Sequence, residues 1–518
     1  MIVKVLMLLI FVCITISVGI YFRKKANSVN DFVLGGRNVG PWLSAFAYGA
    51  TYFSAVVFVG YAGQFGWRLG TSALWIPISN ALIGSLMAWL ILGRRTRIMT
   101  KHLNSATMPE FFGFRYGSPA LKIGASIIVF IFLIPYTASL YNGLSRLFAM
   151  AFGIPFEYCI LAMGIITAIY VVAGGYIATA ANDVIQGSIM LIGISAVVAV
   201  AVKSNGGFTA ALDSLARVSD PKVPRGTVPG IFTSFFGPDP ISWISIVILT
   251  SLGTWGLPQM VARFYSIKSE KMIVKGAVVS SFFAIIVSGG CYLLGSFGRL
   301  YAHMPEIYDK NGAVIYDAIV PAILSGYSEL MVGFIIILIF AASISTLASL
   351  VLASSSTLTL DFLRGHVIKN MSDKKQLVII RVLIVVFIII SSVIAIIQFK
   401  GRITFIAQFM GVSWGALAGS FLAPFLYGLY WKRVSRASVW CCFLFSTILM
   451  TANIFFGSAF PAIIRSPINA GALCVLAGLI IVPLVSAITK APDKAAISNC
   501  FSCYEEEVSV KVKNDLGN

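Results

Sequence analysis

Apolar stretches long enough to cross a membrane recur along the whole chain, and they constrain its fold more than any other feature. The hydrocarbon core of a bilayer is about 30 Å thick, which a helix crosses with roughly 20 residues. Inside that core, only helices and closed barrels satisfy every backbone hydrogen bond. The chain is 58% hydrophobic and only 11% charged. We therefore expect an all-α polytopic membrane protein with about thirteen transmembrane helices.

The distribution of charged residues predicts the orientation of these helices. Residues 2–22 are apolar and a basic triplet follows them, the reverse of a cleaved signal peptide, so a retained first helix is expected. Short loops rich in Lys and Arg alternate with two long acidic loops, 203–240 and 299–329. The positive-inside rule then places the N-terminus outside the cell membrane and the C-terminus in the cytoplasm. Because the net charge of +19 is dispersed over loops, no nucleic-acid partner is expected.

The C-terminal tail, about 490–518, is polar and charged, and we expect it to lack fixed structure. Cys500 and Cys503 form a C-x-x-C motif in this tail. Without a second pair or a His cluster, the motif does not predict a metal site. The three His residues are expected in loops, and no catalytic constellation is visible. Neither an enzyme activity nor an obligatory protein partner is expected.

Two expected spans contain stretches that weaken a helix in the middle of the membrane. In the second span, 41–64, glycine, small and hydroxylated residues run together up to Ser54. In the seventh span, 241–264, two glycines precede Pro258. Proline removes an amide donor, and glycine weakens the helix further. The freed backbone groups predict a bound ion or polar solute, although a plain proline kink is the alternative.

The positions of the two breaks predict an internal repeat. Five spans separate their starts, so with the first helix peripheral they open two units of five helices. An odd number of spans per unit gives the two units opposite topologies, which is the pattern of an inverted repeat. The expected division is a first peripheral helix and cytoplasmic loop (1–40), a first five-helix repeat (41–202), an extracellular loop (203–240), a second five-helix repeat (241–431), two further peripheral helices (432–489) and the cytoplasmic tail (490–518).

A stripe of small and hydroxylated residues marks the expected ninth span. Its members are Ala342, Ser345, Thr346 and Ser349. Their spacing places them on one face of a helix. The stripe has two interpretations: close helix packing with weak inter-helix hydrogen bonds, or oxygen ligands for a small hard cation. Taken alone, it favours packing.

Four stretches, supported by GLPQMVARFYS (256–266), carry a family resemblance. They are GGRNVGPWLSAFAYGATYFSA (35–55), GGYIATAANDVIQG (174–187), AASISTLASLVLASSS (341–356) and WGALAGSFLAPFLYGLYWKR (414–433). From about Asp31 to Arg436 the chain resembles the sodium:solute symporter family, and its bacterial proline carriers most. The resemblance implies a LeuT-like fold, with ten core helices in two inverted halves, and sodium as the coupling ion.

The resemblance also implies a sodium site at the first break. Its ligands are expected to be the carbonyl oxygens of Ala50, Phe53 and Ala342 and the hydroxyls of Ser345 and Thr346. Three of these residues belong to the hydroxyl stripe, so the resemblance favours a cation over packing. Asp183, at the start of an expected span, has two interpretations: a ligand of a second sodium ion, or an acid that stabilises the helix end.

The solute pocket is expected beside the two breaks. The candidates are Tyr52, Ser54, Tyr136, Tyr141, Asn142, Thr254, Trp255, Pro258 and Gln408. For the aromatic side chains, ordinary packing explains their position equally well. No acidic or basic residue is expected in mid-span in these helices, which argues against a multiply charged solute. A zwitterion or a monocarboxylate remains, since helix ends and unpaired amides hold one carboxylate.

These features predict a sodium-coupled symporter that imports a small amino acid such as proline by alternating access. Apolar residues after the first break disfavour a sugar, whereas Tyr52 stands where the proline carriers have an acid. A monocarboxylate or pantothenate-like solute is the alternative. A passive channel or a transport-like sensor shares the broken helices. Proton coupling is disfavoured because no mid-membrane carboxylate or His is expected.

Overall fold

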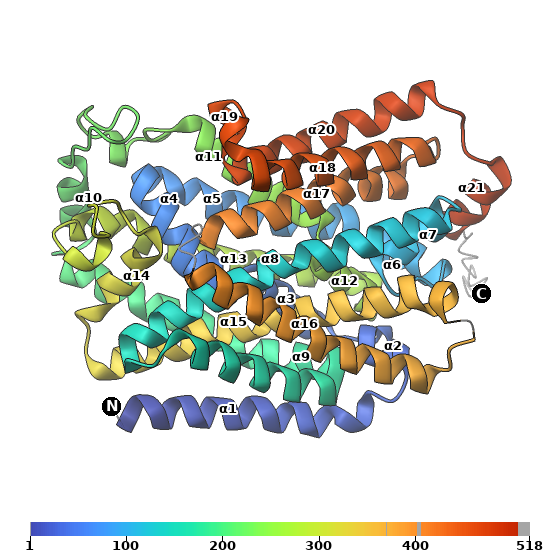
Figure 1. Cartoon of the computed structure of the whole chain (residues 1–518), viewed down its shortest axis with the longest axis horizontal. Coiled ribbons are helices and arrows are strands. Elements are labelled where there is room, and N and C mark those ends of the chain that lie inside the picture. Colours follow the sequence, from blue (N-terminus) through green and yellow to red (C-terminus); the bar gives the residue numbers. More distant parts are fainter. Residues whose placement is uncertain (1, 369, 401–405, 506–518) are drawn as a thin grey trace, which may run out of the picture.

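The computed structural model describes residues 2–368, 370–400 and 406–505, and these form helices joined by loops. Most of the long helices run along the long axis of the molecule (Figure 1). The α-helices are α1 (Ile2–Phe22), α2 (Val29–Leu34), α3 (Pro41–Tyr52), α4 (Ala62–Leu69), α5 (Trp75–Ser79), α6 (Arg94–His102), α7 (Met108–Arg115), α8 (Pro119–Phe152), α9 (Phe156–Ser204), α10 (Phe208–Ala216), α11 (Pro240–Val247), α12 (Pro258–Ser266), α13 (Ile273–Ser296), α14 (Tyr316–Ser325), α15 (Glu329–Thr357), α16 (Asp373–Lys400), α17 (Ile406–Tyr430), α18 (Arg436–Phe456), α19 (Ala462–Arg465), α20 (Pro467–Ile488) and α21 (Lys494–Phe501).

Ten helical stretches among the described residues are long and apolar enough to cross a membrane, or eleven when the bent pair α11–α12 counts as one. Two of them, Val56–His102 and Phe156–Ser204, have 47 and 49 residues, whereas one crossing takes about 20. The second is divided at Gly175, whose φ of 57° and ψ of −146° lie outside the helical region. Each of the two therefore supplies two crossings, in agreement with about thirteen transmembrane helices.

Burial distinguishes the central helix from the outer ones. Every residue in the most apolar window of α15 is buried, whereas only 17% of the corresponding window in α1 is. In Figure 1, α1 lies along one edge of the molecule, and α18 and α20 lie along the opposite edge. The helix that carries the hydroxyl stripe is therefore the one most enclosed by its neighbours.

The first expected break is present, between α3 and the π-helical segment η3 (Val56–Tyr61). Phe53 follows the last residue of α3 with an extended backbone, φ −105° and ψ 91°. The hydroxyl of Ser54 accepts a hydrogen bond of 3.2 Å from the amide of Val56, which begins the next helical segment. Because α3 ends here, the carbonyl groups of its last turn have no helical amide ahead of them.

The second expected break lies between α11 and α12, which are bent by 45°. Pro258 is the first residue of α12, where its missing amide leaves no hydrogen bond unmade. A Cβ on Gly256 would lie 2.7 Å from the backbone nitrogen of Leu422 in α17. Glycine therefore allows the backbone of α17 to pass directly against this break.

Two further glycines bring α4 and α13 into backbone contact. A Cβ on Gly66 would lie 2.1 Å from the carbonyl carbon of Gly295. A Cβ on Gly295 would in turn lie 2.0 Å from the carbonyl oxygen of Ala62. No side chain fits between the two helices at this level, so they pack backbone to backbone.

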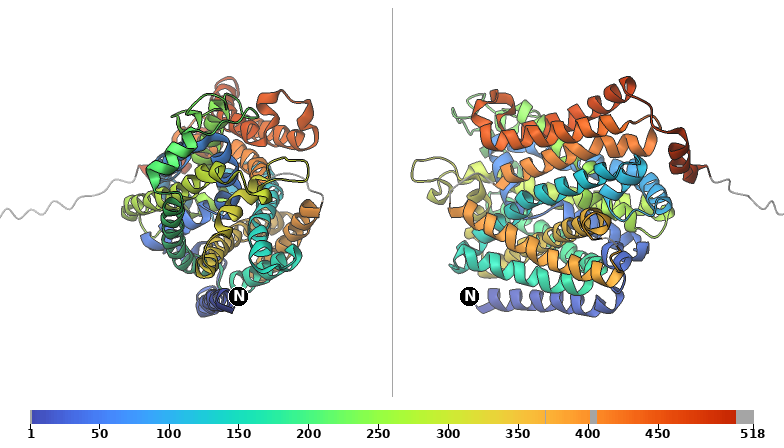
Figure 2. Two further views of the ribbon diagram at one scale, coloured as in Figure 1. Left: turned by 90° about the vertical axis from the view of Figure 1, so that its left-hand side faces the viewer. Right: turned by 45° about the vertical axis from the view of Figure 1, so that its right-hand side comes forward.

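The expectation that the tail lacks fixed structure is wrong for its first part. Helix α21 and the turn Ser502–Tyr504 pack beside α6 and α7, at the end of the molecule opposite the start of α1 (Figures 1 and 2). The Tyr504 hydroxyl donates to the Arg95 carbonyl at 2.9 Å, and Phe501 is buried. An apolar face thus anchors a segment whose polar composition suggested disorder. Residues 506–518 lie outside the described part of the chain. The end that carries α6, α7 and α21 is called the α21 end below.

Candidate functional site

Three of the five expected sodium ligands meet at the first break. The hydroxyl of Thr346 in α15 lies 3.1 Å from the carbonyl oxygen of Ala342 and 3.3 Å from that of Ala50. The Thr51 carbonyl is also 3.3 Å away. These carbonyls belong to the last turn of α3 and to the helix α15 itself. The oxygens of two distant segments therefore converge on one buried hydroxyl.

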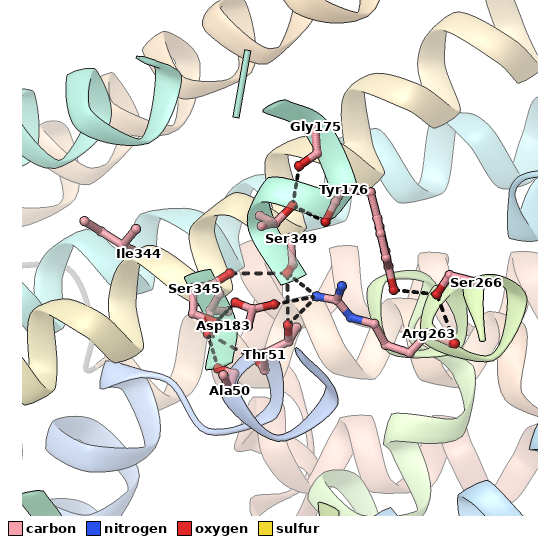
Figure 3. A network of polar contacts seen from close by, with 12 residues as sticks. Ala50, Thr51, Gly175, Tyr176, Asp183, Arg263, Ser266, Ile344, Ser345 and Ser349 are labelled. Atoms are coloured by element: carbon pink, nitrogen blue, oxygen red, sulfur yellow. Dashed lines mark hydrogen bonds and ion pairs between the residues drawn. The ribbon is translucent and has the colours of Figure 1, made fainter. Parts of the chain in front are cut away.

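The other two expected ligands are placed differently. The hydroxyl of Ser345 donates a hydrogen bond of 2.5 Å to Oδ1 of Asp183 and so faces α9 (Figure 3). Phe53 lies in the break itself, where its amide donates to the carbonyl of Gly49 at 3.0 Å. Ser345 and Thr346, one residue apart on α15, thus connect this helix to α9 and α3 respectively.

Asp183 does not lie at a helix start, as the sequence suggested. It lies within α9, about two turns after Gly175, and its side chain is completely buried. The helical segment after the Gly175 bend begins earlier than expected. Asp183 therefore lies in the interior of this segment, not at its first turn. Its interpretation as an acid that stabilises a helix end is therefore wrong.

Arg263, near the end of the expected seventh span, is the charged partner of Asp183. It lies in α12 and is only 2% exposed, with Nη2 3.5 Å from Oδ2 of Asp183. Nη2 also donates to the hydroxyls of Thr51 at 2.7 Å and Ser349 at 2.6 Å. The guanidinium further lies 5.0 Å from the ring centre of Tyr176. A buried base and a buried acid therefore contact each other beside the first break.

This cluster joins four helices through one pair of opposite charges. Figure 3 shows the Asp183 carboxylate between Ser345 on one side and Arg263 on the other. An isolated charge in the membrane interior is costly, whereas a pair of opposite charges in contact is tolerated. Any cation that approaches Asp183 must therefore share its carboxylate with the Arg263 guanidinium.

A narrow crevice leads from the α21 end to this cluster. Its walls include Ala106 and Thr107 before α7, Pro258 and Arg263 of α12, and Ser349 of α15. Its volume is about 40 Å³, room for a few water molecules but not for an organic solute. Pro258, expected in the solute pocket, lines this crevice.

Aromatic side chains enclose the other side of the first break. The rings of Tyr52 and Tyr136 lie 6.3 Å and 5.9 Å from that of Trp414 in α17. The Tyr136 hydroxyl lies beside Ser54 and Trp414, yet neither it nor Nε1 of Trp414 makes a well-aligned hydrogen bond within the described part of the chain. Two buried donors therefore face a common region next to the break. Trp414 was missed from the sequence, although a tryptophan among glycines and alanines is a usable signal.

Three expected solute contacts are engaged in holding the broken helices instead. The Tyr52 hydroxyl donates to the carbonyl of Thr250 at 2.5 Å. The Thr254 hydroxyl donates to the carbonyl of Ser251 at 2.8 Å, and Nε1 of Trp255 donates to that of Ile83 at 2.9 Å. The π-helical segments Asn80–Met87 and Ile248–Leu252 supply these carbonyls, because a wider helix leaves some of them free.

The remaining candidates lie elsewhere. Nδ2 of Asn142 donates to Oε1 of Gln398 at 2.7 Å, so this part of α8 faces α16. Tyr141, also in α8, is buried beside Ser391 and Ser392 of α16. Gln408 lies in the first turn of α17 and is partly exposed. Among the substrate candidates, the structure brings together Tyr52, Ser54 and Tyr136, but not these three.

Comparison with known proteins places this architecture in context. The model of the family described as "Sodium:solute symporter family" matches residues 32–460. The osmoregulated proline transporter OpuE of Bacillus subtilis (strain 168) is 30% identical over 496 residues, covering 93% of this chain and 96% of OpuE. The sodium/proline symporter of Staphylococcus aureus (strain NCTC 8325 / PS 47) is 30% identical over 441 residues, covering 83% and 82%.

Solved structures show the same fold at lower sequence identity. A Na⁺-coupled sialic acid symporter, in a substrate-bound outward-open state, has a TM-score of 0.77 and 18% identity, over 95% of this chain and 98% of that one. Mhp1, a nucleobase-cation-symport-1 family transporter in a closed conformation, has a TM-score of 0.50 and 13% identity, over 90% and 97%. The described chain thus has the LeuT-like fold of these solved structures.

Proposed function

Because this chain belongs to the sodium:solute symporter family, it couples solute movement to sodium, and we propose that its solute is a small zwitterionic amino acid such as proline. Both curated relatives described above carry proline in their names and match most of this chain. The cluster of Tyr52, Tyr136 and Trp414 supports the proposal, since it combines aromatic rings with two buried donors that make no well-aligned hydrogen bond within the described residues. A small ring and one carboxylate suit such a region.

We propose that one sodium ion binds at the first break. Its ligands are the carbonyls of Ala50, Phe53 and Ala342 and the hydroxyls of Ser345 and Thr346. The observation that carries the proposal is the meeting of the Thr346 hydroxyl with the Ala50 and Ala342 carbonyls. Hard cations prefer oxygen ligands, and an unwound membrane helix supplies carbonyls that an intact helix keeps. Asp183 is the proposed ligand of a second sodium ion. When this ion binds, the Asp183 carboxylate gives up part of its contact with Arg263.

Sodium then acts as the link between the two halves of the fold. An ion between α3 and α15 holds the broken helix in the geometry that receives the solute beside Tyr52. Since coupling is reciprocal, bound solute strengthens sodium binding by the same factor. The N-terminus is proposed to lie outside the cell membrane and the α21 end in the cytoplasm. Each inward positive charge then contributes about 2.3 kcal/mol per 100 mV of membrane potential.

Uptake into proteoliposomes tests this function. Purified protein is reconstituted with an inward sodium gradient, and accumulation of labelled proline is followed against the same gradient of potassium. Sodium-dependent accumulation above the external concentration supports the proposal. Equilibration without accumulation indicates a passive channel, and binding without flux indicates a sensor. Competition by unlabelled amino acids, monocarboxylates, pantothenate and sugars then identifies the solute class.

A further inference from the structure

A second and larger cavity lies at the α21 end, away from the two breaks. Its volume is about 420 Å³, within the range of small-molecule sites, about 300–1,000 Å³. The walls come from α6, from the loop after α12 and from the turn after α21. They include Arg97, Lys101, His102, Lys268, Glu270 and Cys503. Figure 1 shows α6 and α21 together at this end.

The cavity carries an excess of positive charge. Lys101 and Lys268 are exposed at its rim. Glu270 is the one acidic residue among its lining residues; it accepts a hydrogen bond of 2.8 Å from Nε of Arg94 and also interacts electrostatically with Arg97, so one acid faces several bases here. Nε2 of His102 lies 2.8 Å from the Asn499 carbonyl in α21, which ties the tail to the same wall.

One nitrogen of the lining residue Arg97 is buried and makes no hydrogen bond with any described residue. Arg97 is only 8% exposed, and its Nε donates to the carbonyl of Ile267 at 2.6 Å. The nitrogen without a hydrogen bond is Nη1. A buried charged donor without an acceptor is costly, so the site is energetically incomplete as it stands.

We propose that this cavity binds a phosphate group. A guanidinium fork and two ammonium groups form the donor set that recognises phosphate oxygens. The phosphate belongs either to the headgroup of an anionic phospholipid or to a soluble anion. The binding of phosphate at this cavity does not depend on the proposed solute. Only the expected effect of phosphate on uptake depends on it.

The position of the cavity connects it to both broken helices. The Ser266 carbonyl, at the end of α12, accepts a hydrogen bond of 3.1 Å from the amide of Val39, just before α3. The Lys268 amide donates back to the Val39 carbonyl at 2.9 Å. Arg97 holds Ile267 between them. An anion bound to Arg97 and Lys268 therefore acts at the junction where α12 ends and α3 begins. Such an anion is expected to change the uptake rate.

A binding measurement on the full-length protein tests the proposal. The probes are inorganic phosphate, with sulfate and chloride at equal ionic strength, and nanodiscs of phosphatidylcholine with or without phosphatidylglycerol. The variant Lys101→Gln/Lys268→Gln is compared with Lys374→Gln/Lys375→Gln, which removes the same charge from the exposed start of α16. The rim variant is expected to weaken binding about tenfold or more, and the control variant to leave it unchanged.

The two sources give different results. Stabilisation by inorganic phosphate that the rim variant loses supports a soluble anion, whereas an effect of phosphatidylglycerol alone supports a lipid headgroup. The proposal is overturned if neither probe raises the thermal midpoint, or if both variants lose the effect equally. Arg97→Lys keeps the charge but removes the fork, so it is expected to weaken binding as well. If this buried variant does not fold, the lysine pair still decides the question.

Discussion

The guanidinium of Arg263 lies 3.5 Å from the carboxylate of Asp183, and the two side chains are 2% and 0% exposed. Asp183→Asn leaves the guanidinium without its counter-charge, and Arg263→Gln does the same to the carboxylate. Each single change is expected to lower the free energy of unfolding by about 3–5 kcal/mol. The double variant removes both charges and is expected to cost less than the sum. Thermal unfolding of the wild type, the two single variants and the double variant measures these losses of stability. Additive losses would show that the two charges are not energetically coupled.

The Thr346 hydroxyl is expected to set the affinity for sodium. Thr346→Val keeps the shape of the side chain but removes the oxygen that meets the Ala50 and Ala342 carbonyls. We expect the sodium concentration for half-maximal uptake to rise about tenfold, the equivalent of one hydrogen bond. Ser343→Ala is the matched control, since that hydroxyl donates to Ile339 within the same helix. Equal sodium dependence in both variants would falsify the proposed role.

The Tyr136 hydroxyl separates solute binding from stability. Tyr136→Phe removes a hydroxyl that lies beside Ser54 and Trp414 without a well-aligned hydrogen bond within the described residues, so the fold is expected to lose little. If the hydroxyl binds solute, KM rises about tenfold while the sodium dependence stays constant. Asn142→Ala is expected to behave in the opposite way, because it breaks the bond to Gln398 and lowers stability. Uptake kinetics and thermal midpoints on the same preparations distinguish the two patterns.

A buried carboxylate near the crevice is expected to stabilise the α21 end. Glu110 is 3% exposed and accepts hydrogen bonds from Arg364 at 2.6 Å and from the amide of Ala106 at 2.7 Å. Glu110→Gln is expected to cost about 2–3 kcal/mol, less than a fully buried pair because Arg364 is partly exposed. Glu505→Gln breaks the exposed contact with Lys432 and is expected to cost about 1 kcal/mol at most. Similar thermal midpoints for the two variants would refute this difference.

The docked tail makes a prediction about cysteine reactivity. Burial raises the pKa of the Cys500 thiol above its ordinary value. The reactive thiolate therefore forms only at higher pH than in a free thiol, and alkylation near neutral pH is expected to be slow. Phe501→Ala removes the buried anchor beside Arg115 and is expected to speed alkylation about tenfold in a Cys503→Ser background. Ser502→Ala removes a hydroxyl that donates only to the Asn499 carbonyl of α21, and it serves as the control. A rate unchanged by Phe501→Ala would show that the tail does not protect this thiol.

The helix breaks and the hydroxyl stripe were predictable because their causes are local. Pro258 and the two glycines before it disfavour a continuous helix through this stretch, and the spacing of Ser345 and Thr346 puts them on neighbouring positions of one helix. The direction in which each hydroxyl points is not local. Ser345 meets Asp183 only because α9 bends at Gly175 and turns its second half towards α15.

Arg263 and the tail show where hydropathy misleads. Hydropathy does not show whether a charged residue at the end of an apolar stretch faces water, and here the bend before α12 places Arg263 among buried hydroxyls. The tail is polar on average, yet Cys500 and Phe501 lie on one side of α21 and are buried against α7 and its neighbours. Average composition does not reveal a single apolar face.

The touching backbones of Gly66 and Gly295 constrain the way the molecule changes shape. Side chains between two helices can change rotamer when the helices slide past each other. At the contact of Gly66 with Gly295, no side chain lies between α4 and α13. We therefore expect α4 and α13 to move as one rigid unit. Helix α13 also packs against α3, where a Cβ on Gly49 would lie 2.5 Å from the ring of Phe283. One helix therefore braces both halves of the first broken helix, on either side of the short extended link at Phe53 beside the proposed ion ligands.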